Sequence, residues 1–184
     1  HALLLDGHGA CRVLRNFEFL EAAIGDDAFC HDHTAARASK ANRLLEAIAE
    51  MDDPQVALRL LRACGGFTRM VHSMGCTPPR AHAAALATFD QMVRTCFGGF
   101  TGLHLEAPAW GQAGRSFVHA GLALRSSVEH ASAAFLASLG SSLASCSELD
   151  GAFSRPDVVA CAEVQDALVA FNAHLPPAQA LPLE

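Results

Sequence analysis

The chain has 184 residues, enough for one domain with a real hydrophobic core, and 51% of them are hydrophobic while 17% are charged. This balance excludes a disordered chain, and the net charge of −6 at pH 7 argues against a free-standing nucleic-acid binder. Every apolar run is shorter than the roughly 18 residues that a membrane helix needs, so we expect an intracellular protein without a membrane-spanning segment.

Residues 1–33 carry aromatic and branched side chains without helical spacing. Val13, Phe17, Phe19 and Ile24 precede Gly25-Asp26-Asp27, which is typical of a turn. The pattern predicts a small β-hairpin, and we treat residues 1–33 as a front segment of their own.

Helical spacing of apolar residues begins near Thr34 and predicts a first helix that ends before Asp52-Asp53-Pro54. Asp53 and Pro54 suit the cap and the first turn of a second helix, which we expect to continue through Gly65-Gly66. The apolar seam of this second helix is Ala57, Leu60, Cys64, Phe67, Val71 and Met74.

A third helix follows Pro78-Pro79, and we expect Gly98-Gly99 to stop it and residues 98–125 to be irregular. Ser126-Ser127-Val128-Glu129 matches a capping box and opens a fourth helix with Val128, Phe135, Leu136, Leu139 and Leu143 inside. A fifth helix starts at Ser154-Arg155-Pro156-Asp157 and ends at Pro176-Pro177.

The elements together predict a mainly α fold, a helical bundle or array of about five helices with a short N-terminal β-hairpin. We divide it into the front segment 1–33, a helical domain 34–150, and a C-terminal helix with a Pro-containing tail at 151–184.

Two short acidic or metal-ligating clusters are candidates for chemistry. Gly25-Asp26-Asp27 resembles a metal-binding polymerase turn, but two-metal catalysis needs carboxylates from a second segment, and only 24 residues precede Gly25. Cys30-His31-Asp32-His33 would need a second ligand pair for zinc, and His72 and Cys76 follow no known spacing. We interpret the first cluster as a polar turn and the second as a solvated turn that enters a helix, and we assign no catalytic residue, metal or cofactor.

The seven cysteines stand singly, with no Cys-x-x-Cys pair, which favours reduced thiols in an intracellular protein. No nucleophile elbow or phosphate-binding glycine loop occurs. A metalloenzyme that uses Cys30-His31-Asp32-His33 stays open as a further, less favoured hypothesis.

Charge is unevenly distributed along the chain. Residues 37–80 hold seven basic and four acidic side chains, whereas the chain from residue 127 onward holds seven acidic side chains and one arginine. Any contact with a polyanion is therefore expected in the first half. The candidate nucleic-acid-binding residues are Arg37, Lys40, Arg43, Arg59 and Arg62. The alternative is a solvated helix face on which Glu46 and Glu50 pair with these cations.

Several segments, read in order, resemble the region downstream of the palm in reverse-transcriptase-like proteins of non-LTR retroelements. Phe19-Leu20-Glu21-Ala22-Ala23-Ile24-Gly25 stands where the family has Leu-Gly-x-Pro-Ile-Gly. The helical blocks DPQVALRLLRACGGFTRMVHSMGCTPP and ATFDQMVRTCF are also similar. Trp110-Gly111-Gln112-Ala113 matches a W-x-Q-A element, Ala120–Ser126 stands where the family reads Gly-Gly-Leu-Gly-Leu-Arg-Ser, and HASAAFLAS follows. The resemblance covers roughly residues 15–150.

The resemblance implies a primer-grip-like front hairpin and a thumb-like helical region that steadies a template–primer duplex. The partners would be an RNA or RNA–DNA duplex and the palm domain of a parent RNA-directed DNA polymerase, with the catalytic motif upstream of His1. Glu21, Ala120 and Ala123 replace glycines of the family pattern, and Ala23 replaces its proline. The first hypothesis is therefore a non-catalytic, thumb-like part of a reverse transcriptase. The second is a helical interaction or scaffold module that derives from such an element and has no nucleic-acid role. Both hypotheses leave the oligomeric state open.

Overall fold

The computed structural model describes residues 2–5 and 11–182, and the side chains from residue 14 onward. The fold is mainly α, as predicted, and its described part has eight α-helices rather than about five. Two antiparallel hairpins precede them, β1 (Ala2–Leu5) with β2 (Cys11–Leu14) and β3 (Phe17–Phe19) with β4 (Ala22–Ile24). The helices are α1 (Asp27–Ala49), α2 (Pro54–Leu60), α3 (Val71–Cys76), α4 (Pro79–Thr101), α5 (Ala107–Gly114), α6 (Ser127–Leu149), α7 (Arg155–Val159) and α8 (Ala162–Asn172). Short helical turns are η1 (Leu61–Gly65), η2 (Phe67–Arg69), η3 (Phe117–His119) and η4 (Pro177–Gln179).

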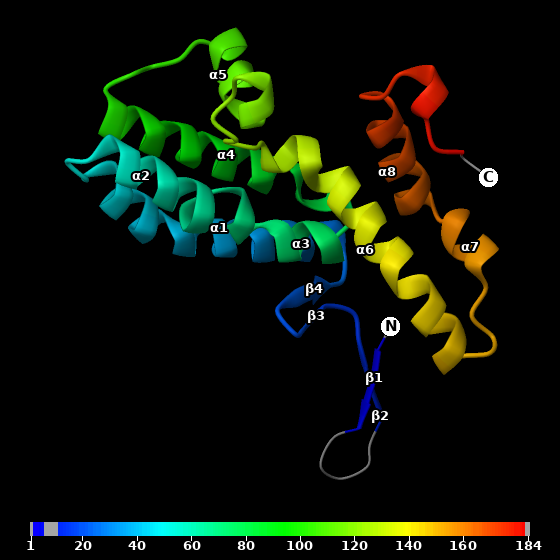
Figure 1. Cartoon of the computed structure of the whole chain (residues 1–184). Helices are drawn as coiled ribbons and strands as arrows, with labels where there is room; N and C mark the ends of the chain where they lie inside the picture. The colour runs from blue at the N-terminus through cyan, green and yellow to red at the C-terminus, as the bar shows by residue number, and fades with distance from the viewer. Residues whose placement is uncertain (1, 6–10, 183–184) are drawn as a thin grey trace.

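The core lies where α1 and α4 run side by side in the same direction (Figure 1). Near their starts, the Thr34 hydroxyl lies 3.1 Å from Nδ1 of His82, and further along, the Cys96 thiol donates to the Leu45 carbonyl at 3.2 Å. The segment from α2 to α3 runs back along these two helices and packs against them (Figure 1). The largest fully buried hydrophobic side chains are Phe89, Ile48, Leu61, Met70, Met74 and Leu86.

The first helix begins at Asp27, so the expectation that residues 27–33 are not helical was wrong. Asp26 caps the helix, because its carboxylate accepts the Phe29 amide at 2.9 Å, and the Asn16 amide holds that carboxylate in place at 2.9 Å. The predicted hairpin is β3–β4, but it turns at Leu20-Glu21 rather than at Gly25-Asp26-Asp27. Asp26 therefore serves as a helix cap.

The expected second helix is interrupted. After α2 the chain makes the wide π-turn η1, and Gly66 adopts φ −94° and ψ −138°, which ends helical geometry before η2. Leu61 lies four residues after the buried Ala57 and is fully buried, while Leu60 is 37% exposed. The predicted seam through Leu60, Cys64 and Val71 was wrong, because all three side chains are exposed.

Gly98-Gly99 do not stop α4, which continues to Thr101 and ends at Gly102 with φ +67°. The missing side chains serve close packing, since a Cβ at Gly99 would lie 2.9 Å from the Ala49 Cβ. Residues 107–114 form α5, so the expectation of an irregular connection over 98–125 was wrong there. Trp110 of α5 packs edge-on against Phe97, at 5.7 Å between ring centroids.

The start of α6 is capped partly from another helix. Ser126 accepts the Glu129 amide at 3.2 Å, which is one half of the predicted capping box. Asp90 of α4 supplies the rest, because its carboxylate accepts the Ser127 amide at 2.8 Å and the Ser126 hydroxyl at 2.7 Å. The expected inner residue Val128 is 41% exposed.

The last predicted helix is divided into α7 and α8, and α8 packs against α6 and α4 (Figure 1). It ends at Asn172, before Pro176-Pro177. The division of the chain at residues 33 and 150 stays a prediction. Within the described residues, none of the helices has the length and apolar character needed to cross a membrane.

Candidate nucleic-acid interface

Arg37 holds two segments of the fold together. Its Nε donates to the Arg69 carbonyl at 3.2 Å, and its terminal guanidinium nitrogen lies 3.3 Å from a carboxylate oxygen of Glu21 in the β3–β4 turn. The side chain is half-buried. Because these two contacts hold the side chain in place, Arg37 acts first as a structural bridge.

Arg62 is stacked on an aromatic ring. Its guanidinium carbon lies 4.2 Å from the centroid of Phe117, in the turn that follows α5. The stack joins the basic first half of the chain to the segment around residue 117. The Nε of Arg62 is buried and has no hydrogen-bond partner within the described residues, so only the terminal N–H groups of the stacked guanidinium can be offered to a phosphate.

Lys40, Arg43 and Arg59 are exposed, and none of them makes an ion pair with another described residue. Glu46, offered as a partner by the solvated-face alternative, accepts instead from the Asn42 amide. These three cations are therefore free to meet a phosphate backbone. Of the five predicted residues, Arg37 and Arg62 are thus held by contacts within the fold, and the other three make no ion pair with a described residue.

Two further arginines, Arg115 and Arg125, were not predicted from the sequence. Arg115 and Arg125 line a cavity of about 1050 Å³ between α5 and the start of α6. The guanidinium of Arg125 lies 5.8 Å from the centroid of Phe67, and His130 meets the same ring edge-on at 5.1 Å. Counting charges along the chain could not find this pair, because each arginine stands alone in a weakly charged stretch. The only signal was the position of Arg125 within the Ala120–Ser126 motif.

The motifs behind the family resemblance contact one another in space. The Gln112 amide of the W-x-Q-A element donates to the carbonyls of His119 and Ala120, at 2.8 and 3.0 Å. The Ala113 carbonyl accepts the Leu122 amide at 2.9 Å. Ser126, which ends the second motif, donates to Asp90 of the ATFDQMVRTCF block. Three separate stretches of sequence thus form one connected structure.

Four non-glycine residues in the described part have positive φ: Leu20, Glu21, Ala120 and Ala123. Glu21, Ala120 and Ala123, at φ 62°, 56° and 55°, are the three residues that replace glycines of the family pattern. Glycine tolerates this conformation, whereas an L side chain is strained in it. Gly121 lies so close to the Arg115 carbonyl that a Cβ would overlap it.

Comparisons of the chain with protein-family descriptions, curated proteins and solved structures found no match.

The Cys30-His31-Asp32-His33 cluster is not a turn as expected, because it lies on the first turns of α1 with Cys30 buried. The Cys30 thiol points to the Ala23 carbonyl at 3.7 Å, and burial raises its pKa. His33 instead lies 3.4 Å from Glu18. The described residues hold no group of three or more His, Cys, Asp or Glu side chains arranged for a metal ion.

Proposed function

We propose that this chain is a non-catalytic, thumb-like segment that follows the palm of a retroelement reverse-transcriptase-like protein, and that it supports binding of the template–primer duplex. The supporting observation is the backbone at Glu21, Ala120 and Ala123. A left-handed conformation costs an L-residue about 1–2 kcal/mol, so local preference does not explain alanine there. A backbone first shaped around glycine explains all three positions at once.

The charged surface supports the nucleic-acid part of the proposal. Lys40, Arg43 and Arg59 are exposed without ion pairs, and Arg62 and Arg125 are backed by aromatic rings. Such groups contact phosphates whatever the base sequence, so we expect a preference for duplex shape rather than for sequence. The β3–β4 hairpin corresponds to the primer-grip element of the resembled family, and the palm of the parent protein would be its neighbour.

The test is fluorescence anisotropy with a labelled RNA–DNA hybrid at increasing salt. Replacing Lys40, Arg43 and Arg59 together by alanine should weaken binding and should lower the slope of log K against log salt by about 2–3, since each phosphate contact contributes about 0.7–0.9. Arg155→Ala, an exposed arginine of the acidic half, is the matched control and should leave the slope unchanged. Binding that ignores salt, or a triple variant that binds normally, would refute the proposal.

A helical interaction module without a nucleic-acid role is the second candidate. It is favoured by apolar side chains that the described fold leaves exposed, above all Val118 and Leu149 at 90% and 89%. This function predicts self-association or a stable protein complex in native mass spectrometry. A strictly monomeric chain that binds the hybrid would count against it.

A further inference from the structure

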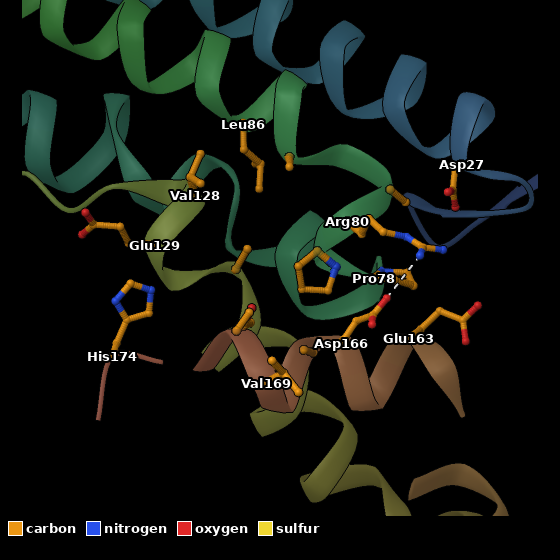
Figure 2. Close-up of a pocket in the computed structure, with 17 residues that line it drawn as sticks. Asp27, Pro78, Arg80, Leu86, Val128, Glu129, Glu163, Asp166, Val169 and His174 are labelled. Carbon is orange, nitrogen blue, oxygen red and sulfur yellow. Dashed lines mark hydrogen bonds and ion pairs between the residues drawn. The ribbon is translucent and has the colours of Figure 1, made fainter. Parts of the chain in front are cut away.

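A groove lies on the part of the molecule where α4, α6 and α8 meet (Figure 2). Its volume is about 670 Å³, within the range of ligand-sized clefts. It is separate from the cations of the proposed nucleic-acid surface, none of which lines it.

The floor of the groove is apolar, and most of its side chains are small. Leu86 of α4, Ala131 of α6 and Ala167 of α8 line it and are almost fully buried. Val128 and Val169 also line it, and they are 41% and 57% exposed. Small residues below exposed valines leave room for large apolar side chains of an incoming partner.

Charged residues also line the groove, and they are mostly acidic. Four carboxylates, Asp27, Glu129, Glu163 and Asp166, stand against the single arginine Arg80, which leaves a formal charge of −3 with His174 neutral. Figure 2 shows Arg80 and Asp166 joined across the groove from α4 and α8, and their closest atoms are 3.2 Å apart. The lining thus already binds a guanidinium of the chain itself, while the other three carboxylates make no ion pair within the described residues.

We propose that this groove docks a basic amphipathic helix of a partner protein, with apolar side chains on the floor and Lys or Arg against the carboxylates. Three helices with a floor of small residues provide a surface of the helix-in-groove kind. The excess of negative charge requires flanking cations and selects against acidic partners, because like charges at an interface are repulsive. The proposal does not depend on nucleic-acid binding.

The probe for the test is a fluorescein-labelled synthetic helix of about four turns, with leucine at i, i+3, i+4 and i+7 and arginine on the flanks. It should bind the full chain at low salt, and binding should weaken as salt rises. Ala170 of α8 is exposed and also lines the groove, so Ala170→Trp should fill the groove and weaken binding at least about tenfold. Glu129→Gln with Glu163→Gln should weaken it about tenfold and reduce the salt dependence.

Matched controls separate the groove from the general surface. Ala144→Trp and Glu148→Gln change exposed residues of α6 that do not line the groove, and they should bind the probe as the unchanged chain does. Circular dichroism checks that each variant is folded. A scrambled peptide that binds equally well, or an Ala170→Trp variant that binds normally, would overturn the proposal. Equally tight binding of a short alkylguanidinium would also overturn it, by showing a site for a small organic cation.

Discussion

Replacing Ala120 or Ala123 by glycine should stabilise the protein, although alanine-to-glycine changes usually destabilise proteins. Both alanines have left-handed backbones, with φ of 56° and 55°. Alanine in this conformation costs about 1–2 kcal/mol, and glycine loses about 0.5–1 kcal/mol more backbone entropy on folding. The difference predicts a gain of about 0.5–1 kcal/mol in the free energy of unfolding for each variant.

Urea unfolding measures this gain as a higher midpoint with an unchanged m-value. In a protein of this size, each kcal/mol should also raise the melting temperature by about 2–4 °C. Ala36→Gly is the matched control, because Ala36 is exposed within the regular helix α1. The same chemical change there should cost about 1 kcal/mol. The control and the two loop variants must therefore shift stability in opposite directions.

The result that would refute the reasoning is a loss of stability in Ala120→Gly as large as that in Ala36→Gly. The backbone at Ala120 would then not be left-handed, and the main support for the proposed function would be removed. Glu21→Gly should gain less than the alanine variants, because it also removes the ion pair with Arg37. That pair involves a carboxylate that is 73% exposed, so its loss costs only a few tenths of a kcal/mol.

Three other changes test separate parts of the fold. Asp90→Ala should lower the free energy of unfolding by about 2–3 kcal/mol, because it removes the contacts that Asp90 makes with the start of α6. Asp90→Asn keeps one acceptor oxygen and should cost less. An equal loss in both variants would contradict the capping role. Burial, with a smaller contribution from the nearby His31, lowers the pKa of His82 from 6.5 to about 4, so the folded state favours the neutral ring. The contribution of the neutral His82 to the free energy of unfolding should therefore be complete above pH 6.5 and should fall by about 3 kcal/mol as the pH drops toward 4. A His82→Gln variant whose free energy of unfolding, measured with urea, falls equally with pH would refute this. In thiol labelling of the native protein, Cys30 and Cys96 should stay protected until unfolding, because burial raises their pKa, that of Cys96 to about 11. The exposed thiols Cys64 and Cys76 should react first, whereas the exposed Cys161 should react more slowly, because its hydrogen bond to Glu163 raises its pKa.

Local patterns in the sequence were enough to predict the mainly α fold and several helix starts. Asp53-Pro54 caps α2, and Ser126 and Ser154 cap α6 and α7, as expected from side chains that bond amides within three residues. These features depend on neighbours in the sequence, which is why inspection of the chain finds them.

Contacts between distant segments account for the errors. Part of the cap of α6 comes from Asp90, the start of α1 is held by Asn16, and α4 continues through Gly99 where it packs closely on Ala49. In each of these cases a partner far along the chain outweighs the local preference of the residues involved. The π-turn η1 also interrupts the helical period on which the predicted second helix depended.

The candidate site shows the same limit for charge. Counting along the sequence assigned polyanion contacts to the first half, yet Arg62 is stacked on Phe117 and Arg125 on Phe67, so the cationic surface draws on both halves of the chain. Conversely, Arg80 belongs to the basic stretch but pairs with Asp166 in the acidic groove. The net charge of −6 therefore does not argue against a nucleic-acid surface here. Screening limits each exposed charge to about 10 Å at 0.1 M salt, so the local arrangement of arginines matters more than their sum.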